Sequence, residues 1–424
     1  MDESQMLAEA VARAWPDDLP GLQDIGRLAS DLLPVLRKLE ATPDEQAEHL
    51  RVEIHNLVKA HPALAEQVRD ELDLLILLTE RGPSRSGPEP SDELRHRRHV
   101  QVELAYATDR RPLADTEAGR WYGADRGELS FGTASVSVPD DHRMGKLERP
   151  RGWPLRFSAD RKQYLDVADV HSCDAASFLA ASAEKLHRAP KPNLLVFVHG
   201  YNVSFTDAVR RAAQLAYDLD FQGVPLLYSW PSEASTSRYF VDGENAQWAQ
   251  PHFQEFLNLV MTSTGSRRVH IVAHSMGNRI LTDALTAVDG TLLPPGSARL
   301  GQVIFAAPDV DSGVFAQRAQ RFTGQAEGYT LYVSGNDQAL NMSQRFVRHP
   351  RAGQAGDGIV VVDGVDTIDV TDLDTGLMSH SYVGSHRSVV SDLYYLLHRG
   401  HRPSDRFGLR PVVSPAGIYW VFRS

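Results

Sequence analysis

The fold is decided by residues 269–281, whose sequence is Val269-His270-Ile271-Val272-Ala273-His274-Ser275-Met276-Gly277-Asn278-Arg279-Ile280-Leu281. Residues 269–273 form a short, mostly apolar and β-branched run, which predicts a buried strand. Residues 274–277 predict a tight corner, and apolar residues return at helical spacing after it. A serine on a strand–turn–helix corner is typical of a catalytic nucleophile.

The residues around this serine meet the steric demand of such a corner. The backbone at the nucleophile is strained, so the residues two before and two after it should be small. Here they are Ala273 and Gly277. A pattern of five residues is common by chance, and the strand before it and the helix after it strengthen the prediction. The alternative is a serine that caps an ordinary helix after a core strand.

The composition is that of a globular protein. The chain has 424 residues, enough for two domains, with 42% hydrophobic and 23% charged residues. The single cysteine, Cys173, excludes an intrachain disulfide and favours a cytoplasmic location. Residues 1–5 lack the features of a signal peptide, and no apolar run reaches the roughly 18 residues of a membrane helix. The net charge of −11 argues against nucleic-acid binding.

The charge is unevenly distributed, which predicts two modules. Residues 1–81 contain 17 acidic and 8 basic residues, so they carry −9 of the −11. Their apolar spacing and the capping box at 42–45 predict an acidic helical bundle, which we expect to act as an adaptor or in self-association. Residues 82–97 are rich in Pro, Gly and Ser and predict a linker. We expect residues 98–424 to form the second domain.

Strand and helix patterns alternate along the second domain. This alternation predicts an α/β domain with a mostly parallel sheet. We expect strands at 100–106, 132–139, 193–198, 224–230, 302–307, 329–333, 359–362 and 367–370, and helices at 174–186, 205–219, 245–261 and 389–398.

Acyl transfer requires a nucleophile, a base, a group that orients the base, and donors for the oxyanion. In a parallel sheet these groups belong on loops at the carboxyl ends of the strands. The base should follow the acid in the chain order Ser, acid, His. His380, in a polar loop before the last helix, is the favoured base, and His386 is the alternative. We expect His398 and His401, at a helix C-terminus, to be structural.

The acid and the oxyanion donors are likewise expected on loops at the carboxyl ends of strands. Asp337, after the strand at 329–333, is the favoured acid, and Asp309, after the strand at 302–307, is the alternative. The backbone N–H groups of Met276 and Tyr201 are the candidate oxyanion donors. Gly200 would allow the Tyr201 loop to approach closely.

Two histidines, His199 and His274, flank these positions, and we expect packed, hydrogen-bonded side chains there rather than a second base.

The segment from about Val100 to Leu397 resembles a bacterial α/β-hydrolase family of unknown function in the esterase/lipase superfamily. The matching blocks are Tyr-Ala-Thr-Asp-Arg at 106–110, Phe-Gly-Thr-Ala-Ser-Val-Ser-Val-Pro at 131–139, Val-His-Gly-Tyr-Asn at 198–202, Ser-Trp-Pro-Ser at 229–232, Ala-His-Ser-Met-Gly-Asn at 273–278, Ala-Pro-Asp-Val-Asp at 307–311, Asn-Asp at 336–337 and His-Ser-Tyr at 380–382. The resemblance implies an α/β-hydrolase fold, a Ser275–Asp337–His380 triad and an oxyanion loop at Tyr201.

The same resemblance suggests Trp230 as a pocket wall and Asp242 as a loop anchor. The expected activity is hydrolysis of a small-molecule or lipid ester without a metal or an organic cofactor. The sequence does not separate an esterase from a lipase, an amidase or a thioesterase. The alternative is a non-catalytic or partner-gated scaffold that is recruited through residues 1–81.

Overall fold

A computed structural model of the chain describes residues 100–114, 121–139, 142–147, 165–234, 238–287, 294–337, 339–340, 343–344, 349–373 and 386–423. The predicted helical module at 1–81, the linker at 82–97 and His380 lie outside these residues. No helix in the described ranges is long and apolar enough to cross a membrane.

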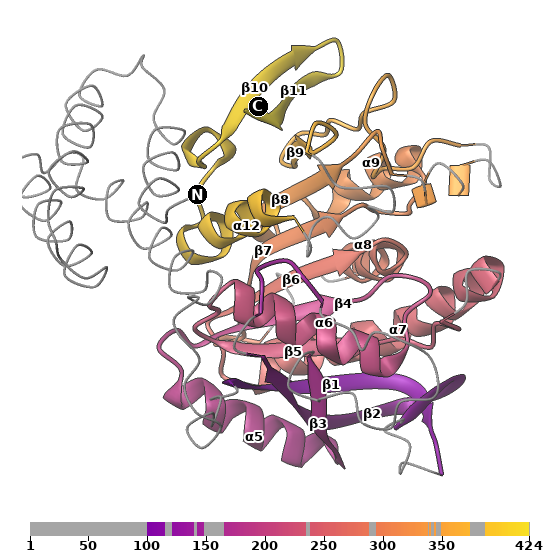
Figure 1. The fold of residues 1–424 in the computed structure, drawn as a ribbon, viewed down its shortest axis with the longest axis vertical. Coiled ribbons are helices and arrows are strands. Elements are labelled where there is room, and N and C mark those ends of the chain that lie inside the picture. The colour runs from indigo at the N-terminus through magenta and orange to yellow at the C-terminus, as the bar shows by residue number, and fades with distance from the viewer. Residues whose placement is uncertain are drawn as a thin grey trace, which may run out of the picture. The chain divides into compact units, whose positions relative to one another are not determined.

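The described chain folds around one mixed sheet (Figure 1), with the strand order β10-β11-β9-β8-β7-β6-β4-β5-β1-β2-β3. Neighbouring strands from β11 to β1 are parallel, whereas the pairs β1–β2, β2–β3 and β10–β11 are antiparallel. The strands are β1 (Val100–Pro112), β2 (Tyr122–Val138), β3 (Asp166–Cys173), β4 (Asn193–Val198), β5 (Val224–Ser229), β6 (Arg268–His274), β7 (Arg299–Ala306), β8 (Ala326–Val333), β9 (Asp366–Asp369), β10 (Leu409–Ser414) and β11 (Gly417–Phe422). The predicted mostly parallel α/β architecture is confirmed.

Helices cover both faces of this sheet (Figure 1). They are α5 (Ala175–Arg188), α6 (Phe205–Asp218), α7 (Tyr239–Ser263), α8 (Gly277–Ala287), α9 (Ser312–Phe322), α12 (Arg387–Arg399) and the short 3-10 helix η5 (Pro403–Asp405). Side-chain caps fix several starts: Asp174 accepts from Ser177 N, Ser204 from Asp207 N, and Asp311 from Val314 N. Gly400 ends α12 in the left-handed conformation, at φ 66°.

Two apolar cores lie on the two faces of the sheet. Apolar residues of α5, α7, α8 and α9 pack on one face, and those of α6 and α12 pack on the other. The central strand β4 is buried along its whole length, as its fully apolar run predicts. The carboxyl ends of the parallel strands β4, β5, β6, β7 and β8 therefore share one edge, where the loops that follow them meet.

Several segments differ from the sequence prediction. The predicted strand at 359–362 is wrong: Val362 forms only an isolated bridge with Val365, across a turn in which Gly364 has φ 80°. Helix α7 begins at Tyr239, six residues before the predicted start. Strands β3, β10 and β11 and helix α9 were not expected, and β3 and β10 are largely exposed, so their apolar patterns are weak.

Candidate active site

Ser275 occupies a strained corner between β6 and α8. Its φ is +51°, a backbone conformation that costs a residue with a side chain roughly 1–2 kcal/mol, and the side chain is buried. Neighbouring backbone holds the corner: Ser275 N donates to Ala306 O at 2.9 Å, and Ser275 O accepts from Asp309 N at 3.2 Å. The surroundings therefore impose the conformation, as expected where strain persists in a native structure.

Asn278 gives this corner a further brace. Its side-chain nitrogen lies within hydrogen-bond distance of three carbonyls, at 3.0 Å from Ala273 O, 3.1 Å from Ser275 O and 3.2 Å from Ala306 O. One buried amide thus ties the end of β6, the corner and the end of β7 together. No role was predicted for Asn278 beyond its place in a family block.

The loop after β4 lies directly against the corner. A Cβ added to Gly200 would lie 2.8 Å from both Ser275 Cβ and His274 Nδ1. A Cβ added to Gly277 would lie 2.4 Å from His199 O. Only residues without a side chain allow this approach. The loop that carries Tyr201 therefore lies against the corner that carries Met276. The N–H groups of these two candidate oxyanion donors donate to no other residue of the described ranges.

His199 supports this loop through both ring nitrogens. Its Nδ1 donates to Gly200 O at 2.7 Å, and its Nε2 accepts from Ser229 Oγ at 3.2 Å. The ring stacks on Trp230 at 5.2 Å between centroids, and Trp230 Nε1 donates to His199 O at 2.8 Å. Burial and the nearby Arg110 guanidinium hold the pKa of His199 well below its ordinary value. These contacts make His199 a neutral structural group, and Trp230 lies behind it with no exposed surface.

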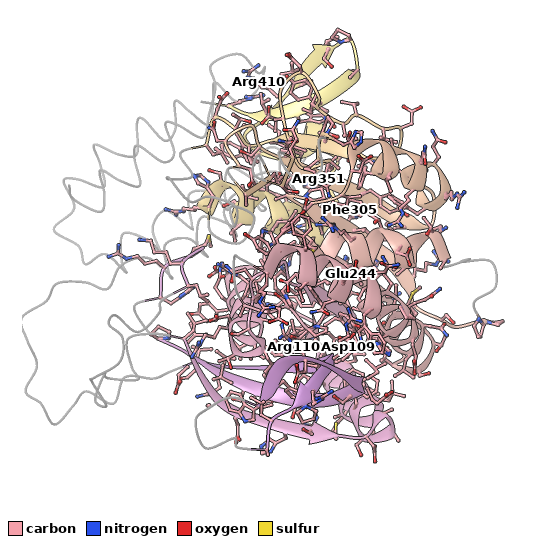
Figure 2. The ribbon with its side chains drawn as sticks, turned by 90° about the vertical axis from the view of Figure 1, so that its right-hand side faces the viewer. Asp109, Arg110, Glu244, Phe305, Arg351 and Arg410 are labelled. Carbon is pink, nitrogen blue, oxygen red and sulfur yellow. The ribbon has the colours of Figure 1, made fainter. Side chains whose placement is uncertain are left out.

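Arg110, a residue of β1 labelled in Figure 2, is a buried support to which no role was assigned from the sequence. Its guanidinium donates to Ser229 Oγ at 3.0 Å, to Ser232 O at 3.0 Å and to Val203 O at 2.8 Å. These contacts join the end of β1 to the loops after β4 and β5. Burial lowers the pKa of Arg110 to about 10, so it remains charged near neutral pH.

Asp242 holds the same two loops from α7. Its Oδ2 accepts from Asn202 N at 3.1 Å and from Ser232 Oγ at 2.6 Å, and its Oδ1 accepts from Glu233 N at 2.7 Å. The carboxylate is fully buried. These contacts fit the loop-anchor role that the family resemblance suggested.

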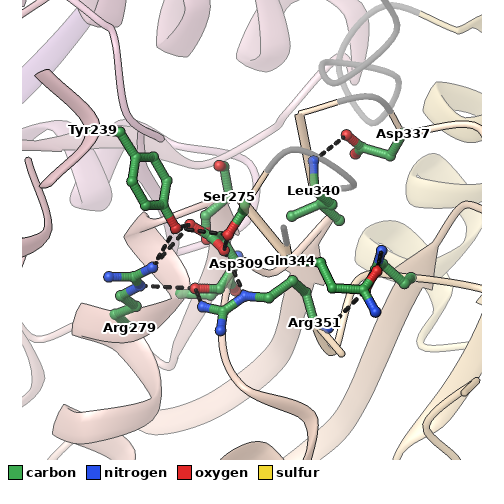
Figure 3. Close-up of polar contacts among 11 residues, drawn as sticks. Tyr239, Ser275, Arg279, Asp309, Asp337, Leu340, Gln344 and Arg351 are labelled. Atoms are coloured by element: carbon green, nitrogen blue, oxygen red, sulfur yellow. Dashed lines mark hydrogen bonds and ion pairs between the residues drawn. The ribbon is translucent and has the colours of Figure 1, made fainter. Parts of the chain in front are cut away.

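The two candidate acids have different surroundings (Figure 3). Asp337 follows β8, is fully buried and accepts from Leu340 N at 3.0 Å. Asp309 follows β7 and pairs with Arg351 at 2.7 Å and with Arg279 at 3.0 Å. Burial alone would raise the pKa of Asp309, but the two guanidinium groups and the hydrogen bonds from two hydroxyls together lower that pKa.

The structure describes some, but not all, of the C-terminal histidines that were considered as the base. His380, the favoured base, lies in the range 374–385, outside the described residues. His386 is the N-cap of α12, where its Nδ1 accepts from Ser388 N at 3.3 Å. His398 donates from Nε2 to Leu219 O at 2.8 Å and stacks on Tyr394, which fits the expected structural role. His274 ends β6 beside Gly200.

Two cavities of the described chain lie away from this site. One is lined by residues at the start of β5, and the other by residues at the starts of β7 and β8. Both belong to the edge of the sheet opposite Ser275. Among the residues that the structure describes, no group of three or more His, Cys, Asp or Glu side chains is placed to hold a metal ion.

Comparison with known proteins identifies a family. Residues 134–398 match the family model described as alpha/beta hydrolase of unknown function (DUF900). Among curated protein sequences, none matches the chain. The chain is similar to several solved structures, among them an esterase from Pyrococcus furiosus (10% identity over 75% of this chain and 99% of that one, TM-score 0.29), an arylesterase (9%, 84% and 97%, TM-score 0.26) and an acylaminoacyl peptidase from Pyrococcus horikoshii (14%, 72% and 41%, TM-score 0.25).

Proposed function

Since the chain belongs to this family of α/β-hydrolases, we propose that it is a serine hydrolase that cleaves acyl esters through Ser275, His380 and Asp337. The observation that carries the proposal is the strained, buried serine between β6 and α8, with the glycine loop after β4 held against it. Strain at a single non-glycine residue is typical of functional sites. A helix-capping serine has no need of a positive φ, because an N-cap residue is usually extended.

In the proposed reaction, Ser275 Oγ attacks the acyl carbonyl carbon while His380 takes the hydroxyl proton. The N–H groups of Tyr201 and Met276 donate to the oxyanion of the tetrahedral intermediate. The carbon–oxygen bond to the alcohol then breaks, and His380 delivers the proton to the leaving alkoxide. Water hydrolyses the acyl-serine by the same steps in reverse, while Asp337 holds the imidazole of His380 in the required tautomer.

The contacts of Asp309 favour Asp337 as the acid. Both oxygens of Asp309 already accept hydrogen bonds, from Arg351 and Ser343 on one side and from Arg279 and Tyr239 on the other. A histidine would have to displace one of these donors. The chain order Ser, acid, His fits both aspartates. The acid of this fold usually follows the later of the two strands, which is β8 before Asp337.

A small-molecule or lipid ester is the proposed substrate, and an amide or a thioester would use the same groups. A cytoplasmic location and self-association through residues 1–81 are further proposals, which rest on the single cysteine and on the acidic helical pattern.

The test is hydrolysis of a panel of p-nitrophenyl esters of increasing acyl length by the full chain. Ser275→Ala and His380→Ala should each lower kcat by about 10⁴-fold or more, because a triad acts as a unit. Ser404→Ala, at an exposed serine, is the control and should match the wild type. Full activity of Ser275→Ala would refute the proposal. A folded wild type that turns over neither esters, amides nor thioesters would favour the scaffold hypothesis.

A further inference from the structure

The side chain of Asp309 joins several segments of the chain beside the candidate nucleophile (Figure 3). Its Oδ1 accepts from Arg351 Nε at 2.7 Å and from Ser343 Oγ at 2.7 Å. Its Oδ2 accepts from Tyr239 OH at 2.6 Å and from Arg279 Nη2 at 3.0 Å. A carboxylate has about four lone-pair sites, so these four donors use its full capacity.

The backbone of Asp309 is held as firmly as its side chain. Its N–H donates to Ser275 O at 3.2 Å, so residue 309 touches the corner itself. Its carbonyl accepts from Arg279 Nε at 2.8 Å and from Arg351 Nη2 at 2.7 Å. Each arginine therefore grips both the main chain and the side chain of Asp309, in the forked geometry that only a guanidinium offers.

Arg351 extends this contact toward the candidate acid. The segment that follows it pairs with the loop after β7, through Ala352 N to Val310 O at 2.8 Å and Gly353 N to Pro308 O at 3.0 Å. On its other side, Gly353 O accepts from Ser334 N at 2.9 Å, three residues before Asp337. These hydrogen bonds, together with the short stretches of main chain between them, connect the Ser275 corner to the Asp337 loop.

We propose that Asp309 and Arg351 form a positioning pair, which fixes the separation of the Ser275 corner and the Asp337 loop. This inference rests on the proposed function. The pair does not touch the reacting atoms and acts through Ser275 and Asp337. A strained corner keeps its geometry only while its neighbours constrain it, and a misplacement of about 1 Å can lower a rate by about 10²-fold.

The experiment measures the rate at which a fluorophosphonate probe labels the folded full chain, as a function of pH. Labelling forms a bond from serine oxygen to phosphorus, releases fluoride and passes the hydroxyl proton to the base. Arg351→Lys keeps the charge but cannot reach the carboxylate and the carbonyl in one fork. We expect it to slow labelling by roughly 10- to 100-fold with an unchanged pH midpoint. Asp309→Asn, which also removes a charge, should slow labelling at least as much.

Asp218→Asn is the matched control. This buried carboxylate at the far end of α6 accepts from His142 Nε2 at 2.8 Å and from Gly145 N at 2.7 Å. Its loss should lower the free energy of unfolding, as the loss of Asp309 should, but leave the labelling rate at the wild-type value. The control therefore separates destabilisation from misalignment of the nucleophile.

Wild-type labelling rates in folded Arg351→Lys and Asp309→Asn would overturn the positioning role. If Asp309→Asn does not fold, the labelling rate of Arg351→Lys decides the question alone. A shifted pH midpoint in Asp309→Asn, with wild-type labelling of Asp337→Asn, would make Asp309 the triad acid and would also overturn the positioning role. Absence of labelling in the folded wild type would contradict the proposed function itself. Failure of the proposed function is therefore distinguished from failure of the positioning role, in which the wild type is still labelled.

Discussion

Gly200 lies so close to Ser275 that a Cβ added to the glycine would be 2.8 Å from the Cβ of the serine. Gly200→Ala must therefore push the loop after β4 away from the corner, and the N–H of Tyr201 moves with that loop. We expect kcat/KM for a p-nitrophenyl ester to fall by about 10²-fold or more. Gly358→Ala, whose new Cβ would meet Pro350 only at 3.8 Å, should leave kcat/KM unchanged. Wild-type activity in Gly200→Ala would mean that this loop does not form the oxyanion site.

The positive φ of Ser275 predicts a stability difference between two inactive variants. At φ +51°, glycine is free of the steric cost that any Cβ incurs. Ser275→Gly should therefore be more stable than Ser275→Ala by about 1 kcal/mol in urea unfolding. Equal stability of the two variants would show that the corner stores no strain.

Asp337→Asn tests the assignment of the acid directly. If Asp337 orients the base, the amide should favour the wrong tautomer of the imidazole, and kcat should fall by about 10⁴-fold. Asp311→Asn is the control from a neighbouring loop: Asp311 caps α9 by accepting from Val314 N at 2.9 Å, and asparagine caps as well as aspartate does. A kcat for Asp337→Asn close to that of the control would exclude Asp337 as the acid.

Buried His270 predicts a loss of stability in mild acid. Its Nδ1 accepts from Gln302 N at 2.9 Å, and burial lowers the pKa of His270 from 6.5 to about 4. Between these two values the unfolded chain binds the proton and the folded chain does not, so stability falls as the pH drops from about 6.5 toward 4. The full effect corresponds to about 3 kcal/mol in the free energy of unfolding.

His270→Asn keeps an acceptor for Gln302 N but cannot titrate. Its free energy of unfolding, measured in urea at a series of pH values, should therefore decline less in mild acid than that of the wild type. His187→Asn, at an exposed histidine, should follow the wild type. An equal decline in His270→Asn and the wild type would contradict the assignment.

The parts of this protein that the sequence predicts are those encoded by neighbouring residues. The Ser275 corner was predictable because strand, turn and helix signals lie within 13 consecutive residues. The fully apolar run of β4 and the alternation of strands and helices likewise identify the parallel sheet. Strand β3 was missed because most of its side chains are at least partly exposed, so its sequence lacks a clear apolar alternation.

The supports of the site could not be predicted in the same way. Arg110 reaches Val203 across 93 residues of sequence, and Arg351 reaches Asp309 across 42. Their partners are backbone carbonyls and buried carboxylates that come together only after the sheet has formed. Local spacing carries no signal for such contacts. In the folded structure, by contrast, a buried arginine is unusual and therefore indicates a paired, structural role.

The most direct test of the account is the site of fluorophosphonate modification, located by mass spectrometry of the peptides from labelled full chain. The account predicts one adduct per chain, on the peptide that contains Ser275, and no adduct in Ser275→Ala. An adduct on another residue, or none in the folded wild type, would contradict the claim that Ser275 is the activated nucleophile.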